Sequence, residues 1–249
     1  MAREALPNPS WFADDSGTSA IEYAVIMAGV AVAMVGSVLL LGHNLRGSFQ
    51  NAGTGMSSQQ PTVSTGGVLF SEKLANAAAI QGVAFLGNGW GIQNNQLSSG
   101  ANPGARGEQR ALFPGTTAAD STIIADATFA TGSSFGVFFR ASGSVAQLNG
   151  YSFQYSPEAG GVFTVQKWIN GVEIARPVAS SAVPAGFART DGAQQVSVTT
   201  RGATFTAAVN GRPMLIGSDG TYHSGGAGLR VSSGSKAAFT NFQVTTPSR

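Results

Sequence analysis

Glu22 is a carboxylate at the start of a long apolar segment. From Ala24 to Leu41 the sequence contains no charged residue. A carboxylate inside a membrane helix is energetically costly, so an ionisable residue in such a place is a functional candidate by default. The chemistry open to Glu22 is the pairing of its negative charge with a positive group, in a setting where an unpaired charge costs several kcal/mol.

The apolar segment is long enough to cross a bilayer. As a helix rising 1.5 Å per residue, residues 24–41 would extend about 27 Å, close to the ~30 Å hydrocarbon core. Polar or basic residues follow it: His43, Asn44 and Arg46. A secretory signal peptide explains the segment less well, because the residues before it end in Asp14 and Asp15 instead of a basic run.

The residues around Glu22 follow a recognisable sequence pattern. Residues 14–42 read DDSGTSAIEYAVIMAGVAVAMVGSVLLLG. This stretch resembles Flp-type prepilins of Tad (type IVb) pili, whose short leader ends in Gly and whose mature chain has Glu fifth and Tyr sixth. The resemblance covers about residues 11–50. It implies cleavage between Gly17 and Thr18 by a prepilin peptidase, with Glu22 and Tyr23 taking part in filament assembly.

Cleavage at this point would give Glu22 a partner. The new N-terminus at Thr18 would carry a positive amine, and in a packed helical bundle the Glu22 carboxylate of one subunit could pair with that amine on its neighbour. Such a pair would also fix the register between subunits. Tyr23 could anchor at the membrane interface or bond near the pair. The alternative is an ordinary membrane anchor with Glu22 in the headgroup layer.

The composition excludes several functions. The chain has no cysteine, which excludes thiol catalysis and Cys-ligated metals. It has only two histidines, His43 and His223, so a His-rich metal site is not expected. The net charge is +2 and the arginines are scattered singly, which gives no sign of nucleic-acid binding.

The sequence divides into four parts. We expect a leader at 1–17, a hydrophobic assembly or transmembrane helix at 18–50, a Gly/Ser/Thr-rich linker at 51–67 and a head at 68–249. Flp pilins are often little more than the helix. The additional head therefore leaves open whether this chain is a major or a specialised minor subunit.

The head is predicted to consist of strands. Apolar residues alternate with polar ones in about ten short segments, and dipeptides such as Asn170-Gly171 and Asn210-Gly211 supply the positive φ of tight hairpins. In residues 135–142 the alternation places Phe135, Val137, Phe139 and Ala141 on one face. The predicted class is α+β in total: one N-terminal helix followed by an all-β antiparallel sandwich or jelly roll.

The order of these strands resembles that of concanavalin-like domains of the lectin, glucanase and laminin-G kind. The segments that carry this resemblance are FGVFFRAS, NGYSFQYS, VQKWING, VSVTTRGATFTAAVNG and GGAGLRVSSGSKAAFTNFQV. It covers about residues 68–247 and implies a jelly-roll sandwich. Another jelly roll or an immunoglobulin-like sandwich remains an alternative.

Catalysis by the head is not expected. Glycosidases need two carboxylates facing each other about 5–9 Å apart, and the Glu-x-Asp-x-x-Glu motif of laminarinase-like members is absent. Asp126 and Glu173 both fall in predicted strands, so a pair across neighbouring strands is the alternative that these two leave open. His223 lies in a turn without a nucleophile elbow and is better explained as a surface residue.

Binding of a saccharide is the better hypothesis, because lectin-like sites stack aromatic rings on sugar faces. The candidates are Trp168, Trp90, Tyr222 and Asp219. Trp168 falls on the face opposite Phe163 and Val165, so we expect it to be exposed. No dense acidic loop marks a cofactor, although a calcium ion held by Asp219 and loop carbonyls is an option in this fold. Tyr151 should be in the core, and Arg140 should be a solvated charge.

The sequence thus predicts a structural pilin. Its precursor would lie in the cytoplasmic membrane and then join copies of itself in an extracellular pilus, through the pilus assembly machinery. The lectin-like head would serve adhesion or bind carbohydrate. The alternatives are a membrane-anchored glycan-active enzyme and a pseudopilin of a secretion system.

Overall fold

The structure, a computed structural model, describes residues 67–156, 161–184 and 192–247. In this part of the chain no helix is long and apolar enough to cross a membrane. The predicted leader, hydrophobic helix and linker, with Gly17, Thr18, Glu22 and Tyr23, lie outside the described residues. Those predictions therefore remain predictions.

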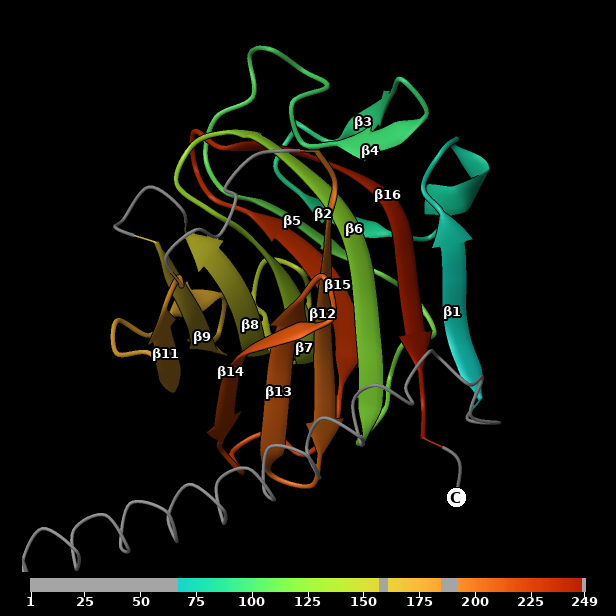
Figure 1. The fold of residues 1–249 in the computed structure, drawn as a ribbon. Helices are drawn as coiled ribbons and strands as arrows, with labels where there is room; N and C mark the ends of the chain where they lie inside the picture. Colours follow the sequence, from blue (N-terminus) through green and yellow to red (C-terminus); the bar gives the residue numbers. More distant parts are fainter. Residues whose placement is uncertain (1–66, 157–160, 185–191, 248–249) are drawn as a thin grey trace, which may run out of the picture. The chain divides into compact units, whose positions relative to one another are not determined.

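The described residues form a sandwich of two antiparallel sheets (Figure 1). Sheet A has the order β14-β13-β12-β6-β16-β4-β3, and β1 pairs with β16 beside β4. Its strands are β1 (Val68–Lys73), β3 (Gly91–Gln93), β4 (Gln96–Ser98), β6 (Ser121–Thr131), β12 (Gln194–Arg201), β13 (Thr204–Val209), β14 (Arg212–Ser218) and β16 (Lys236–Thr245).

Sheet B has the order β10-β9-β8-β7-β15-β5-β2, and β11 also pairs with β9. Its strands are β2 (Ala84–Leu86), β5 (Gln109–Leu112), β7 (Phe135–Ser142), β8 (Asn149–Ser156), β9 (Val162–Ile169), β10 (Val172–Glu173), β11 (Ala179–Ala182) and β15 (Gly226–Val231). One short 3-10 helix, η1 (Ala78–Ile80), follows β1. The all-β antiparallel sandwich is confirmed, with more and shorter strands than the ten expected.

The main core lies between the sheets and follows the predicted alternation. In β6, Ile123, Ala125, Ala127 and Phe129 are buried while the residues between them are half-exposed. Aromatic rings fill much of the core; Phe113 stacks on Phe242, for example, with ring centroids 4.1 Å apart. The hairpin turns at Asn170-Gly171 and Asn210-Gly211 have positive φ at both residues, as predicted.

The alternation fails in β7. Phe135, Val137 and Phe139 face the main core, but Arg140 has a φ of +50° and the register with β8 shifts between Phe139 and Ser142. This bulge turns Ala141 to the outer face of sheet B, where it joins Phe138, Leu148 and Trp168 in a second apolar cluster. The predicted position of Ala141 on the main core face was therefore wrong.

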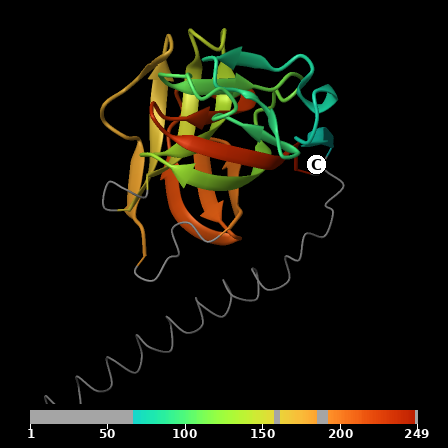
Figure 2. The same cartoon turned by 90° about the horizontal axis from the view of Figure 1, so that it is seen from above.

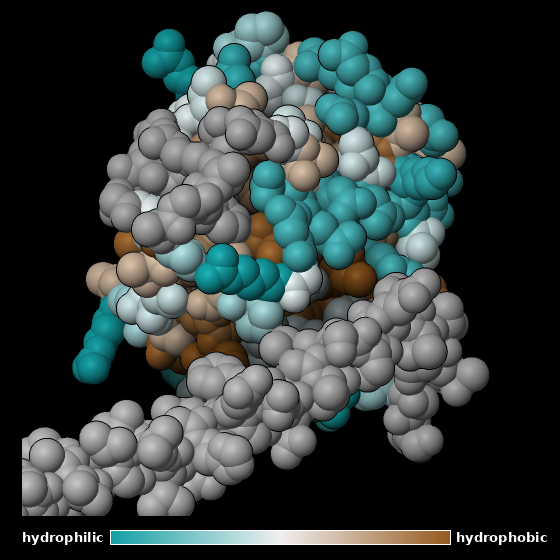
Figure 3. Space-filling view, viewed as in Figure 1, coloured by the Kyte–Doolittle hydropathy of each residue, from teal (hydrophilic) through white to brown (hydrophobic). Residues whose placement is uncertain are grey.

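Figures 1 and 2 show the strands at the two sides of the sandwich. β1 lies on one side and β11 on the other, and β14 packs beside β11 and β9. Figure 3 shows hydrophilic side chains over β6 and β16 on the outer face of sheet A. The outer face of sheet B is different, because β7 and β8 are buried on both sides.

Candidate functional site

Trp168 lies on the outer face of sheet B, as its position in the sequence predicts, but it is buried. Only 1% of the residue is exposed. Its ring packs edge-on against Phe138, with centroids 5.4 Å apart, and its Nε1 donates to Ser152 Oγ at 2.8 Å. The expectation of an exposed ring was wrong, because other side chains cover it.

Two arginines cover the ring. Arg110 on β5 and Arg230 on β15 are directly opposite each other, and their Cζ atoms lie 4.5 Å and 5.2 Å from the Trp168 ring centroid. Both distances are within the range of a cation–π contact. With Glu108 and Glu173 these residues form a group that we call the Trp168 cluster.

The carboxylates hold the arginines in place. Glu108 accepts hydrogen bonds from Arg110 through both oxygens, at 3.1 and 3.2 Å, and from Arg230 Nε at 2.8 Å. Glu173 Oε2 accepts from Arg230 Nη2 at 2.8 Å. Two positive and two negative charges thus balance in a site where the arginine side chains are less than a tenth exposed. Such balance and full pairing are what a buried ion network requires.

A bent hairpin brings Glu173 to this site. β10 and β15 are four strand positions apart, which is about 19 Å in a flat sheet. Arg110 Nη2 donates to the Gly171 carbonyl at 2.8 Å, and Gly171 N donates to the Leu148 carbonyl. The β9–β10 turn therefore folds over the outer face. A Cβ on Gly171 would lie 1.9 Å from the Ala146 carbonyl oxygen, so only glycine fits.

The atoms of the Trp168 cluster that can still form a hydrogen bond are acceptors. The guanidinium nitrogens are used by carboxylates, serine hydroxyls and the carbonyls of Val145 and Gly171. The side chains of Glu108 and Glu173 are 23% and 28% exposed, and Glu173 Oε1 has no hydrogen bond to any described residue. Nearby, opposite Ser152, the buried Oε1 of Gln166 lacks a partner among the described residues. The two partly exposed carboxylates fit a ligand that donates hydrogen bonds from hydroxyl groups.

Asp219 and Tyr222 lie on the other side of the Trp168 backbone. Tyr222 is half-buried, and its hydroxyl donates to the Trp168 carbonyl at 2.9 Å. Tyr151, which is buried as predicted, donates from its hydroxyl to Asp219 Oδ1 at 2.6 Å. Lys167 Nζ lies 2.6 Å from Asp219 Oδ2. The structure thus brings Asp219 and Tyr222 together in the loop between β14 and β15, where both contact Tyr151.

The Asp219 carboxylate is already fully engaged. Burial opposes its ionisation, but hydrogen bonds from Lys167, Thr221 and Tyr151 outweigh that and hold the pKa of Asp219 well below its usual range. Burial and Asp219 raise the pKa of Tyr151 to about 12. Within the described ranges no three His, Cys, Asp or Glu side chains gather to hold a metal. Three donors already share the Asp219 oxygens and compete with the calcium ion predicted there, which remains a prediction.

Arg140 organises the same end of the sandwich. It is 3% exposed, so the expectation of a solvated charge was wrong. Its guanidinium donates to the carbonyls of Ala119, Tyr222 and Gly202, and Asp120 lies 3.7 Å away. The bulge in β7 turns the Arg140 side chain toward three loops. The alternation of residues in β7 does not predict this direction.

Of the remaining predicted positions, Trp90, Asp126 and His223 do not join the Trp168 cluster. Trp90 is half-buried against Phe85 and Phe239. Asp126 lies on β6 of sheet A and Glu173 on β10 of sheet B, so the cross-strand pair considered for catalysis does not exist. His223 is exposed, as predicted.

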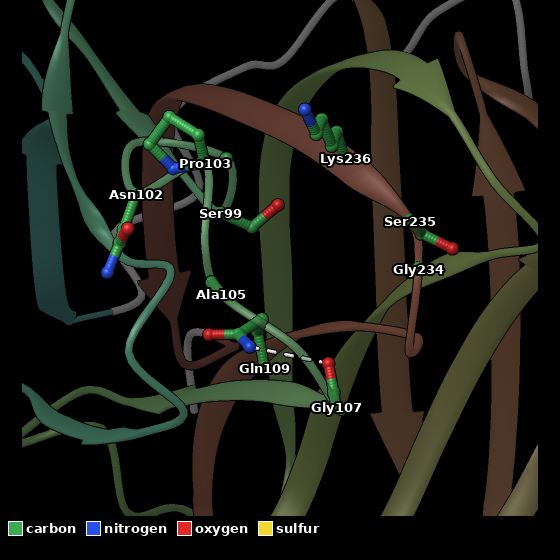
Figure 4. A pocket seen from close by; sticks show the side chains of 10 residues that line it. Ser99, Asn102, Pro103, Ala105, Gly107, Gln109, Gly234, Ser235 and Lys236 are labelled. Atoms are coloured by element: carbon green, nitrogen blue, oxygen red, sulfur yellow. Dashed lines mark hydrogen bonds between the residues drawn. The ribbon is translucent and has the colours of Figure 1, made fainter.

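A shallow pocket lies between the loop after β4 and the turn before β16 (Figure 4). Its volume is about 50 Å³, which is room for a few water molecules. Ser99, Asn102, Gln109 and Lys236 contribute to its lining, but no aromatic ring does. It offers no stacking surface for a sugar.

Sequence reasoning missed the two arginines of the Trp168 cluster. The sequence holds a signal for one of them, because Arg230 stands between the apolar residues Leu229 and Val231 of its strand. Arg110 follows Gln109 and gives no such signal. Their meeting depends on the pairing of β5 with β15, which are more than a hundred residues apart in the chain.

Comparison with known proteins separates the two parts of the chain. Residues 11–56 match the Flp/Fap pilin component family. That segment contains Gly17, Thr18, Glu22 and Tyr23, and the match agrees with the predicted resemblance. The chain thus carries a segment similar to the Flp/Fap pilin component ahead of a β-sandwich. No curated protein matches the sequence.

Solved structures that resemble this chain are lectin-like sandwiches. The carbohydrate-binding module CBM66 from Bacillus subtilis is 19% identical, with a TM-score of 0.54 over 66% of this chain and 96% of that one. A Bacillus subtilis protein of unknown function with a galectin-like fold is 15% identical, with a TM-score of 0.58 over 74% and 98%. The carbohydrate recognition domain of Emp47p is 11% identical, with a TM-score of 0.52 over 72% and 96%. These likenesses establish the fold.

Proposed function

We propose that this chain is a structural subunit of a type IVb Flp/Tad-like pilus whose head binds carbohydrate. The pilin match over residues 11–56 carries the first part of the proposal, because it includes the predicted cleavage and assembly residues. A prepilin peptidase cuts after Gly17, and residues 18–50 leave the cytoplasmic membrane for the filament core. There Glu22 neutralises the Thr18 amine of a neighbour, with Tyr23 beside it. The linker at 51–67 then carries the head at 68–249 on the cell surface.

The Trp168 cluster is the proposed saccharide site. Its accessible acceptors are the carboxylate oxygens of Glu108 and Glu173, which accept hydrogen bonds from sugar hydroxyls. Since a carboxylate repels an anion, the ligand is a neutral saccharide. The lectin-like fold supports this role, and CBM66 is itself named a carbohydrate-binding module.

The role is binding and structural, without catalysis. The two carboxylates of the cluster are tied to arginines, and neither is arranged as a free general acid. In this proposal Trp90, Tyr222 and Asp219 support the fold and are not ligand contacts. The head needs no bound cofactor, and we expect its saccharide binding to survive removal of calcium by EDTA.

The filament part is tested at the N-terminus. Mass spectrometry of the protein in sheared surface filaments should find a chain that starts at Thr18. Glu22→Ala cells should lose filaments or incorporate little of this protein. A chain that starts at Met1 or Ala2 and stays in the membrane would favour an anchored lectin or anchored glycan-active enzyme. Correct cleavage without long filaments would favour a pseudopilin.

The binding part is tested with Glu173→Gln in the full chain. We expect at least about tenfold weaker binding to neutral glycans on an array, the loss of one charged hydrogen bond. Asp126→Asn is the matched control, because Asp126 is a half-exposed carboxylate on the outer face of sheet A. Equal binding by both variants would place the saccharide elsewhere on the head.

A further inference from the structure

The chain has four asparagines that directly precede a glycine, and all four lie in the described part of the head: Asn88, Asn149, Asn170 and Asn210. An Asn-Gly pair can lose ammonia spontaneously, because glycine has no side chain to hinder the attack of its backbone nitrogen on the asparagine Cγ. The attack requires this nitrogen to release its proton. A glycine N–H that is buried or donates a hydrogen bond must first open locally, so the fold decides which pair reacts.

Two of the four pairs are protected by burial. Gly89 is buried, and its N–H donates to Gln109 Oε1 at 2.8 Å. Gly150 is buried in β8, opposite Trp168 of β9. A Cβ on Gly150 would lie 2.7 Å from the Arg140 carbonyl oxygen, so the backbone there has no room to turn. We therefore expect Asn88 and Asn149 to be stable in the folded protein.

The other two pairs occupy equivalent turns. Asn170-Gly171 joins β9 to β10, and Asn210-Gly211 joins β13 to β14, each as a two-residue hairpin loop. The φ angles are +49° and +80° in the first turn and +51° and +74° in the second. Both turns therefore have the same sequence and nearly the same backbone conformation. Any difference in their reactivity must come from their surroundings.

The surroundings of the two glycines differ. Gly171 N donates to the Leu148 carbonyl at 2.8 Å, and a Cβ on Gly171 would lie 1.9 Å from the Ala146 carbonyl oxygen. Gly211 is exposed, and its N–H has no hydrogen bond to any residue that the structure describes. Nothing lies within 4 Å of a Cβ placed on Gly211. The nitrogen of Gly211 is thus the one that can release its proton to water without local opening.

The side chain of Asn210 is also prepared for the attack. Gln195 N donates to Asn210 Oδ1 at 2.8 Å, and Asn210 Nδ2 donates to Gln194 Oε1 at 2.7 Å. The first bond directs a donor at the oxygen on which negative charge develops when Cγ is attacked, which favours the reaction. The side chain of Asn170 has no hydrogen bond to any described residue; only its backbone N–H is bonded, to Asn149.

We infer that Asn210 is a site of spontaneous deamidation, a modification that needs water and no enzyme. Gly211 N releases its proton to solvent and bonds to the Asn210 Cγ. The Cγ–Nδ2 bond then breaks, and the nitrogen leaves as ammonia. Water opens the resulting cyclic imide at either carbonyl and gives aspartate or isoaspartate. No atom is oxidised or reduced. The inference stands independently of the pilus and saccharide proposals.

The modification weakens this end of sheet A. Gln194 is 7% exposed, and its Oε1 would lose the Asn210 Nδ2 donor and face a carboxylate instead. An acceptor left unpaired at a buried site costs stability. Isoaspartate also adds an extra backbone atom to a two-residue turn, which changes the register of the β13–β14 hairpin. Heads that have aged should therefore unfold more readily than new ones.

Mass spectrometry of the aged protein tests the inference. The full chain would be incubated in mildly alkaline buffer, digested at acidic pH and scored at each asparagine for the mass gain of an amide converted to an acid. In the folded protein we expect Asn210 to react at least about fivefold faster than Asn170, the factor that one hydrogen bond gives. The urea-unfolded chain is the control, because all four pairs should then react at similar rates. Equal rates at Asn170 and Asn210 in the folded chain, or an unchanged Asn210, would overturn the inference.

A second measurement tests the effect on stability. Asn210→Asp reproduces one product of the reaction, and we expect it to lower the urea concentration at the midpoint of unfolding. Asn88→Asp is the matched control, because Asn88 is exposed and its side chain has no hydrogen bond to the described residues. This variant should keep the wild-type midpoint. An Asn210→Asp protein as stable as the control would contradict the weakening of sheet A.

Discussion

The outer face of sheet A is partly exposed to solvent, whereas the outer face of sheet B is covered over β7 and β8. On sheet A each strand has one buried and one solvated side, as in β6. On sheet B the strands β7 and β8 are buried on both sides, and the outer layer consists of Trp168 and its charged cover. An antiparallel sheet normally faces water on one side. Sheet B departs from this because loops and a bent hairpin cover its outer face.

The difference has an energetic consequence. Side chains such as Thr122 and Thr199 on sheet A exchange hydrogen bonds with water at little cost. On sheet B, Arg110, Arg230 and Ser152 are buried, so each polar atom needs a partner within the protein. Substitutions on sheet B should therefore cost far more stability than the same substitutions on sheet A.

The largest effect is expected for Trp168→Ala. The ring fills the space between Phe138 and two guanidinium groups, so its removal leaves a cavity lined by charges. We expect a loss of about 3–5 kcal/mol in the free energy of unfolding, measured by chemical denaturation with circular dichroism. Trp168→Phe keeps much of the packing and should lose about half as much. A loss below 1 kcal/mol for Trp168→Ala would mean that the outer layer of sheet B is not a true second core.

The next effect is expected for Arg140→Met. The substitution removes the donors for the carbonyls of Ala119, Gly202 and Tyr222, which then lie unpaired at a buried site. We expect a loss of about 3 kcal/mol in the same measurement. Arg201→Met is the matched control, because Arg201 is exposed and should change stability by less than about 0.5 kcal/mol. Equal effects would contradict the organising role of Arg140.

The same contrast explains what could be predicted from the sequence. The alternation identified the inner faces of both sheets, because an inward position needs an apolar side chain wherever its strand lies. Turn positions such as Asn210-Gly211 were also readable, since positive φ selects Asn and Gly. The lectin-like fold and the pilin segment followed from longer patterns.

The outer layer of sheet B could not be predicted in this way. Period-2 alternation places Trp168 and Arg140 away from the main core, and for an ordinary sheet that means exposure. Their burial depends on a bulge in β7 and on a hairpin that folds back, both set by contacts distant in sequence. The Arg110–Arg230 pair depends on strand order, which local patterns do not contain.

A third, smaller effect concerns alkaline pH. The pKa of Tyr151 is raised to about 12, whereas a tyrosine in the unfolded chain titrates near 10, so the unfolded chain loses its proton first as pH rises. The stability that this phenol contributes is complete below about pH 10 and is lost as pH rises toward 12. Unfolding midpoints of Tyr151→Phe should fall less steeply over this range than those of wild type. A slope of Tyr151→Phe equal to that of wild type would contradict the assignment.

The smallest effect is expected on sheet A and gives the sharpest comparison with sheet B. Thr199 Oγ1 lies 3.1 Å from Thr122 Oγ1 on a half-exposed face, so water can replace the hydroxyl that Thr199→Ala removes. We expect a loss of no more than about 0.5–1 kcal/mol. Ser152→Ala also removes one hydroxyl, but it leaves the buried Trp168 Nε1 without an acceptor, and we expect a loss of about 1–3 kcal/mol. If denaturation gave the two variants the same stability, water would have to reach the Trp168 indole. The outer face of sheet B would then be a solvated surface like that of sheet A.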